Sequence, residues 1–257
     1  MTRERTWPAL LWIVRHGQSA ANVIAERAES AHEAVVAVVD RDADVPLSAL
    51  GVRQARALAR WFAALPQDQR PTVIATSPYE RARRTASMIR EELGGGVDLL
   101  IDERLREREL GAFDRLTRKG WTDRFPEQAE LRARLGKFYH RPPGGESWCD
   151  VILRLRTFMH DVQLRHAGAR LLVVAHQVIV LGARYILEEL DEAAILAIGA
   201  RGDIANCAVT AYEASPTGRA PDGRREEMRL VLENHVAPVE EAGEPVTTAP
   251  DEPVAPR

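Results

Sequence analysis

The sequence is poor in cysteine, in lysine and in long apolar runs, and each shortage excludes a class of protein. Cys149 and Cys207 are its only cysteines, too few for a disulfide framework and without metal-ligand spacing, so we expect a reducing compartment. The longest apolar run near the start, residues 8–14, is too short to span a bilayer. It continues into Arg15 without a small-residue cleavage site, which argues against a signal peptide and predicts a soluble, cytoplasmic protein with no membrane partner.

Charge of one sign does not dominate the chain either. Its 257 residues include 35 Lys and Arg against 38 Asp and Glu, and only Lys119 and Lys137 are lysines. The near balance excludes a strongly basic nucleic-acid binder and a polyacidic solvating protein. The preference for arginine carries no function by itself, since coding composition produces the same skew. With 45% apolar residues, the chain has ample material for the core of one large domain.

Three apolar runs predict strands of a parallel sheet. They are residues 9–14, 72–76 and 171–175. Continuous apolar runs, without alternation, are typical of strands covered by helices on both faces. Each run is followed at once by polar residues, namely Arg15 and His16, Ser77, and His176. Because the carboxyl ends of parallel strands meet at one edge of a sheet, we expect a ligand site there.

Helical patterns lie between and after these runs. The patterned segments are residues 48–64, 79–93 and 147–166. Ser48 and Ser147 are placed to cap two of these helices. Residues 112–140 are charged and weakly periodic, which predicts short helices inserted over one end of the sheet and the active site. The predicted fold is therefore α/β: a three-layer α/β/α sandwich with a mostly parallel central sheet.

The last part of the chain predicts an edge hairpin and a tail. Residues 207–213 and 228–234 alternate around a loop rich in Gly, Pro and Arg, which predicts an antiparallel edge. Residues 237–257 consist mostly of Pro, Glu, Ala, Val and Thr without an aromatic residue, which predicts a disordered tail. The folded domain is then expected to span residues 1–236.

One short motif after the first predicted strand points to phosphate chemistry. Its residues are Arg15, His16, Gly17, Gln18 and Ser19, with Asn22 close behind. A neutral imidazole is a competent nucleophile toward phosphorus, and a neighbouring guanidinium holds phosphate oxygens bidentately. A turn at Gly17 lets the backbone come close to an anion. Taken alone the motif is weak, and a surface turn histidine is the alternative interpretation of His16.

The full set of motifs resembles the histidine phosphatase superfamily, which includes the cofactor-dependent phosphoglycerate mutases and many small phosphatases. Besides the Arg-His-Gly turn, the matching segments are residues 46–55, 77–86, 104–111, 144–147 and 173–176. They occur in the family's order over residues 9–236. Any one segment arises easily by chance, so the ordered set carries the resemblance.

The resemblance implies a role for each of five residues. His16 would be the nucleophile, with its other ring nitrogen donating to a backbone carbonyl. Arg15, Arg81 and His176 would neutralise the phosphate oxygens. Glu107 would protonate the leaving alcohol and then act as base toward water.

Neighbouring residues leave two of these assignments open. Arg84 lies three residues after Arg81 on a similar helix face, and Glu109 lies two residues after Glu107. A satisfied core histidine is the ordinary interpretation of a residue such as His176, and the family pattern reverses it. Further phosphate or substrate contacts are expected from Gly17, Gln18, Asn22 and Gln177. The last of these stands where the family commonly has glycine.

The predicted function is a metal-independent phosphomonoesterase that acts on a small phosphorylated metabolite through a phosphohistidine on His16. The resemblance implies no cofactor, and the sequence holds no His, Asp and Cys cluster suited to a metal. The alternatives are a cofactor-dependent phosphoglycerate-type mutase and a catalytically silent phospholigand-binding module. Residues 23–45 exceed what a minimal family member needs and predict either a lid or an extended helix. The oligomeric state is open, a homodimer included.

Overall fold

The computed structural model describes residues 7–220, 223 and 226–248. Within this part of the chain, six strands form one mixed sheet in the order β3-β2-β4-β1-β5-β6. The strands are β1 (Leu10–Arg15), β2 (Val73–Thr76), β3 (Asp98–Ile101), β4 (Arg170–Ala175), β5 (Val209–Ala214) and β6 (Met228–His235). The first four run parallel, and the β5–β6 hairpin adds the antiparallel edge. The predicted mostly parallel sheet is confirmed.

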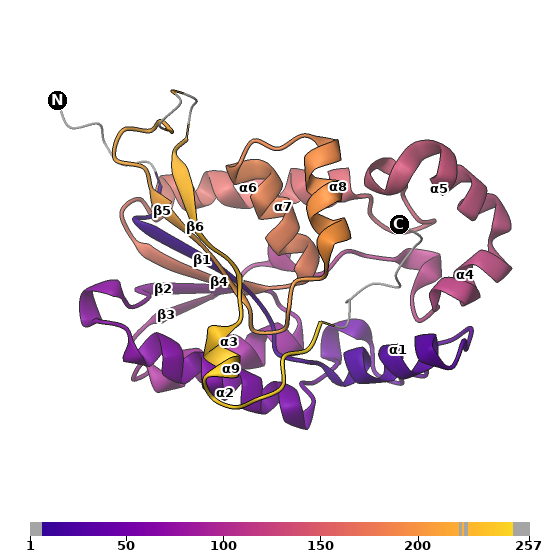
Figure 1. Ribbon diagram of the computed structural model, residues 1–257, viewed down its shortest axis with the longest axis horizontal. Coiled ribbons are helices and arrows are strands. Elements are labelled where there is room, and N and C mark those ends of the chain that lie inside the picture. Colours follow the sequence, from indigo (N-terminus) through magenta and orange to yellow (C-terminus); the bar gives the residue numbers. More distant parts are fainter. Residues whose placement is uncertain (1–6, 221–222, 224–225, 249–257) are drawn as a thin grey trace.

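Helices cover both faces of this sheet and its carboxyl end (Figure 1). They are α1 (Ala20–Ser30), α2 (Ala49–Ala64), α3 (Glu80–Glu92), α4 (Arg118–Arg124), α5 (Pro126–Tyr139), α6 (Trp148–Arg165), α7 (Gln177–Leu187), α8 (Glu192–Arg201) and α9 (Ala237–Glu240). On one face lie α2, α3 and α9, and on the other α6, α7 and α8. The three-layer prediction is confirmed. None of the helices in the described ranges is both long and apolar enough to cross a membrane.

The central strand β1 explains why its sequence is apolar without alternation. Leu11 and Ile13 belong to the core under α6 and α7, whereas Trp12 and Val14 belong to the core under α2 and α3. Successive side chains of a strand point to opposite faces, so a strand covered on both sides needs apolar residues at every position. Because β1 is packed on both faces, the position of His16, the residue that follows it, is fixed at the edge of the sheet.

The predicted helical insertion is present as α4 and α5, which lie beyond the carboxyl ends of the parallel strands (Figure 1). The other long segment, residues 23–45, is not one extended helix, because α1 ends at Ser30. Its later part runs beside the insertion: the Val36 amide donates to the Arg115 carbonyl oxygen at 2.9 Å, and that of Thr117 to Ala34 at 3.2 Å. The later part of residues 23–45 and the helical insertion together cover the carboxyl edge of the sheet.

The predicted disordered tail begins too early in the sequence. Residues of α9 are folded, and Val239 is fully buried in the core beneath α2. Farther on, the Gln54 side-chain amide of α2 donates to the Pro245 carbonyl oxygen at 2.8 Å and to Thr247 Oγ1 at 3.0 Å. One buried valine and hydrogen bonds to a neighbouring helix order this segment despite its composition. Residues 249–257 of the predicted tail lie outside the described residues.

Candidate active site

The turn after β1 places His16 at the carboxyl edge of the sheet, and two glycines make that turn possible. A Cβ on Gly17 would lie 2.5 Å from the carbonyl oxygen of Gly51, and a Cβ on Gly51 would lie 1.9 Å from that of Gln18. Only glycine at both positions lets the turn pack this closely on the first turn of α2. The close approach seen at Gly17 is to α2, and an approach of its backbone to an anion stays a prediction.

The contacts of His16 fix which of its ring nitrogens carries the proton. Nδ1 lies 2.7 Å from the carbonyl oxygen of Gly17, which only accepts, so Nδ1 is the protonated nitrogen. Nε2 accepts from Nε of Arg81 at 3.2 Å. The imidazole is thus neutral, with its lone pair on Nε2, and it is fully buried. This is the tautomer that a nucleophilic histidine requires.

His176 and Glu107 join His16 from other parts of the chain. The ring centroids of His176 and His16 lie 5.1 Å apart. Nε2 of His176 is 2.8 Å from Oγ of Ser77, the residue that follows β2, and its Nδ1 is 3.6 Å from Oε2 of Glu107. Glu107 is only 3% exposed. The polar residues that follow β1, β2 and β4 therefore converge at one edge, as the strand pattern predicts.

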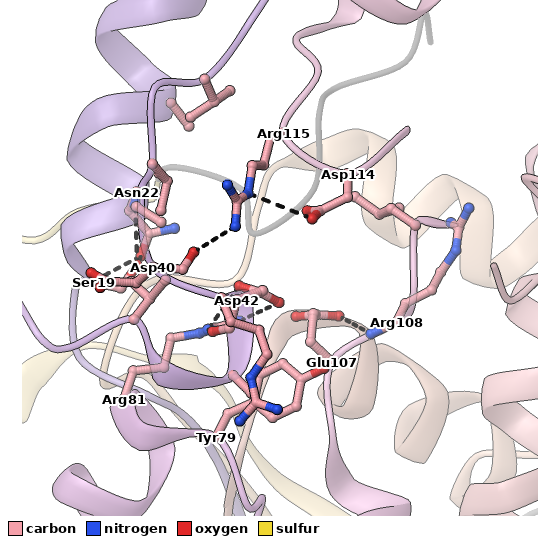
Figure 2. Close-up of a pocket in the computed structure, with 18 of the residues that line it drawn as sticks. Ser19, Asn22, Asp40, Asp42, Tyr79, Arg81, Glu107, Arg108, Asp114 and Arg115 are labelled. Atoms are coloured by element: carbon pink, nitrogen blue, oxygen red, sulfur yellow. Dashed lines mark hydrogen bonds and ion pairs between the residues drawn. The ribbon is translucent and has the colours of Figure 1, made fainter. Parts of the chain in front are cut away.

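The two predicted arginines have different surroundings. Arg15 is fully buried, and its Nη1 donates to the carbonyl oxygen of Ile204 at 2.6 Å. Arg81, in the first turn of α3, donates through Nη1 to the Asp42 carbonyl oxygen at 2.6 Å and to its Oδ1 at 3.0 Å. Its guanidinium also lies 5.0 Å from the ring centroid of Tyr79. Arg81 thus contacts both His16 and Asp42, and Figure 2 shows its contact with Asp42.

The two alternative residues have other partners, although Glu109 also lines the cleft described below. Arg84 is partly exposed and pairs with Glu91 at 3.2 Å. Glu109 is exposed and accepts from the Tyr79 hydroxyl at 3.1 Å. Burial raises the pKa of Tyr79, and the nearby Glu109 carboxylate raises it further, so the hydroxyl remains a donor. The geometry thus brings Arg81 and Glu107, not their neighbours, to the two histidines.

The remaining predicted contacts differ in where they point. Asn22 lines the cleft beside the site, although its Oδ1 accepts from the amide and hydroxyl of Ser19 at the start of α1. Gln18 instead accepts from Ser48 Oγ at 2.7 Å. Gln177 donates to Asp203 at 2.7 Å. Of the three, only Asn22 lies on the cleft wall.

A cleft of about 950 Å³ opens above Arg81 and Glu107. Its walls are α1 with residues 36–45, and residues 106–116 (Figure 2). Asp42, Tyr79 and Arg108 also belong to this site and were not predicted from the sequence. Only Arg108 carried a signal, because it follows the predicted acid directly. Across the described residues, no group of three or more His, Cys, Asp and Glu side chains is arranged to hold a metal ion.

Comparisons with known proteins match the chain to one protein family. A family model described as the histidine phosphatase superfamily (branch 1) matches residues 11–224. The 2,3-bisphosphoglycerate-dependent phosphoglycerate mutase of Methylobacterium sp. (strain 4-46) is 34% identical over 179 residues, which cover 65% of this chain and 74% of that one. The enzyme of the same name from Methylorubrum extorquens (strain PA1) is 33% identical over 136 residues, covering 52% of this chain and 63% of that relative's length.

Solved structures are similar over nearly the whole chain. A mycobacterial glucosyl-3-phosphoglycerate phosphatase in complex with inorganic phosphate matches with a TM-score of 0.67 and 26% identity, covering 90% of this chain and 99% of that one. Bacillus stearothermophilus YhfR matches with a TM-score of 0.67 and 24% identity, covering 89% and 98%. The second likeness concerns the fold alone. The matched relatives thus include proteins named as mutases and as a phosphatase.

Proposed function

The chain belongs to the histidine phosphatase superfamily (branch 1), and from that premise we propose that it is a metal-independent phosphomonoesterase. In this proposal it hydrolyses a small phosphorylated metabolite through a phosphohistidine on His16. The contact between Arg81 Nε and His16 Nε2, at 3.2 Å, supports the proposal most directly. It sets a phosphate-binding cation beside a ring nitrogen that keeps its lone pair.

The first step transfers the phosphoryl group to the protein. Nε2 of His16 forms a bond to phosphorus while the bond from phosphorus to the ester oxygen breaks. Glu107, protonated at the start, gives its proton to the leaving alcohol. Arg15, Arg81 and His176 stabilise the charge on the other phosphate oxygens through the transition state. The carboxyl of Glu107 lies 3.6 Å from the His176 ring, on the same side of the site.

The second step returns His16 to its starting state. Glu107, now a carboxylate, takes a proton from water as the water oxygen bonds to phosphorus. The bond between phosphorus and Nε2 then breaks, and inorganic phosphate leaves. The hydrogen bond from His16 Nδ1 to the Gly17 carbonyl keeps the ring oriented through both steps, because it also stabilises the ring when Nε2 carries a substituent.

A mutase is the second candidate, since two sequence relatives bear that name. A mutase also forms the phosphohistidine but returns the phosphoryl group to a re-oriented intermediate instead of to water. The structural relative at 26% identity is named as a phosphatase. Residues 114–141, whose first residues line the cleft, do not resemble the corresponding region of the glycolytic mutases, and this favours hydrolysis.

One assay separates these candidates. The purified protein is given 3-phosphoglycerate and, separately, p-nitrophenyl phosphate, each in chelator with and without 2,3-bisphosphoglycerate. We expect phosphate release from p-nitrophenyl phosphate that does not depend on the bisphosphate, and no isomerisation of 3-phosphoglycerate. Isomerisation faster than phosphate release would support the mutase, and tight ester binding without any turnover would support the silent module. A cytoplasmic location, the lack of nucleic-acid and membrane partners, and a homodimer stay predictions.

A further inference from the structure

The cleft above the proposed site is acidic, although the site itself is built to hold an anion. Acidic side chains outnumber arginines in its lining, and lysine is absent from that lining. Most of the arginines are paired with acidic groups. Arg41 bonds to Asp44 at 2.8 Å, and Arg106 bonds to Glu146 at 2.6 Å. The positive charge of the arginines that face the cleft is therefore largely neutralised by neighbouring carboxylates.

A further arginine of the lining is also held by acidic residues. Arg115 donates to the Asp40 carbonyl oxygen at 3.0 Å and lies 3.8 Å from the Asp114 carboxylate (Figure 2). The carboxylates of Asp40 and Glu26, both on the cleft wall, pair with no arginine or lysine in the described part of the chain. The wall that faces a bound alcohol thus carries net negative charge.

Asp42 is the cleft residue whose carboxylate bonds directly to Arg81, the proposed phosphate-binding arginine. Its carboxylate bonds to Arg81 at 3.0 Å and is 43% exposed, so it lies between the guanidinium and the cleft (Figure 2). A phosphate dianion bound at Arg81 would take up the positive charge that now compensates Asp42. The carboxylate would then present an uncompensated negative charge to the group esterified to that phosphate.

We propose that this cleft selects phosphate monoesters by the charge of their alcohol, with Asp42 as the specificity-determining residue. Esters of cationic amino alcohols are preferred, esters of neutral polyols follow, and esters of carboxylated alcohols are rejected. The inference rests on the proposed function, because it names the substrate class of the same site. Rejection by like charge is a common source of specificity, since it raises the free energy of the wrong complex.

Three esters of similar size test the ranking: phosphoethanolamine, glycerol 1-phosphate and 3-phosphoglycerate. We expect kcat/KM to fall in that order, by about tenfold between the first and the last at low salt. The ratio should shrink as salt is added, because ions screen charges across an open cleft. Equal or better use of 3-phosphoglycerate would overturn the proposal.

Two matched substitutions test whether Asp42 causes the preference for the charge of the alcohol. Asp42→Asn removes one charge from an exposed side chain with little change in volume, and it should reduce the ratio between phosphoethanolamine and 3-phosphoglycerate severalfold. Asp68→Asn makes the same change in an exposed 3₁₀ turn outside the cleft and should leave the ratio unchanged. An unchanged ratio in Asp42→Asn, or an equal change in both variants, would remove Asp42 from the role.

A binding measurement separates failure of this inference from failure of the proposed function. The affinity of the His16→Ala variant for the three esters is measured by calorimetric titration, which needs no turnover. If the wild-type protein releases phosphate neither from these esters nor from p-nitrophenyl phosphate, the phosphatase proposal fails. The affinities still decide the charge selection: tighter binding of phosphoethanolamine than of 3-phosphoglycerate supports it, and the reverse order overturns it.

Discussion

Nε of Arg81 donates to Nε2 of His16 at 3.2 Å, while Nη1 of the same guanidinium is bonded to Asp42. One arginine thus joins the proposed nucleophile to the wall of the cleft. Arg81 is almost fully buried, so its position is set by these partners and by the first turn of α3. Arg81 therefore connects His16, the proposed nucleophile, to residues 36–45 of the cleft wall.

Arg81 and Arg84 should differ sharply on substitution. Arg81→Ala removes a cation from the phosphate site, and we expect kcat/KM for phosphate esters to fall by about a hundredfold or more. Arg84→Ala removes only a surface pair with Glu91, so its activity should stay within about twofold of the wild type. Steady-state kinetics on both variants decide the point. Equal losses would mean that the wrong arginine has been assigned.

Glu107 and Glu109 can be separated by the leaving group. Glu107→Gln removes the proposed proton donor, which should lower kcat/KM, the measure of the first step, by about a hundredfold to ten-thousandfold for an alkyl phosphate. The loss should be much smaller for p-nitrophenyl phosphate, because its phenolate leaves without a proton. Glu109→Gln alters an exposed carboxylate that accepts from the Tyr79 hydroxyl, and it should change kcat/KM for either ester by no more than about twofold. A leaving-group effect in Glu109→Gln instead would exchange the two roles.

Sequence patterns predicted the strands at the centre of the sheet and the hairpin at one edge, but they missed β3 at the other edge. Three of the parallel strands, β1, β2 and β4, are apolar because helices cover both of their faces. The edge strand β3 is short and begins at Asp98, and its Ile101 is 55% exposed. Such a strand has no two-sided burial to produce an apolar run, so its pairing with β2 depends on the rest of the sheet.

The site was predictable where a functional residue follows a strand or begins a helix. His16, His176 and Arg81 all do, and their positions follow from local structure together with family motifs. Asp42 could not be predicted in this way, because its place depends on packing of residues 34–36 against residues 115–117. Contacts between segments so far apart leave no local pattern in the sequence.

The segment after β6 should contribute to stability. Val239→Ala removes two methyl groups from a fully buried position, which should cost roughly 2 kcal/mol of unfolding free energy. Val246→Ala is the matched control, since Val246 is 36% exposed and should cost much less. Thermal unfolding of the two variants measures the difference. Equal melting temperatures would restore the interpretation of residues 237–248 as an unpacked tail.

His140 should make stability depend on pH below neutrality. Burial, with Arg132 and Arg108 nearby, lowers the pKa of His140 from its ordinary value of 6.5. The unfolded chain therefore binds a proton at a higher pH than the folded chain. The stabilisation is complete above about pH 6.5 and is lost as the pH falls through the lowered pKa of the folded state.

Melting temperatures between pH 8 and pH 5 test this dependence. His140→Phe, which cannot titrate, should lose less stability over that range than the wild-type protein. His160→Gln alters an exposed histidine of α6 and should keep the wild-type slope. If His140→Phe keeps the wild-type slope as well, the buried histidine does not account for acid sensitivity.

Trapping the phosphorylated protein tests the central claim most directly. Wild-type protein and His16→Ala are mixed with a ³²P-labelled phosphate ester in chelator, quenched within milliseconds in alkali, and analysed for label on the chain. A phosphohistidine survives alkali and is lost in acid, so we expect alkali-stable, acid-labile label on residue 16 of the wild-type protein and none on His16→Ala. Turnover with no such label, or label that persists in His16→Ala, would contradict the mechanism.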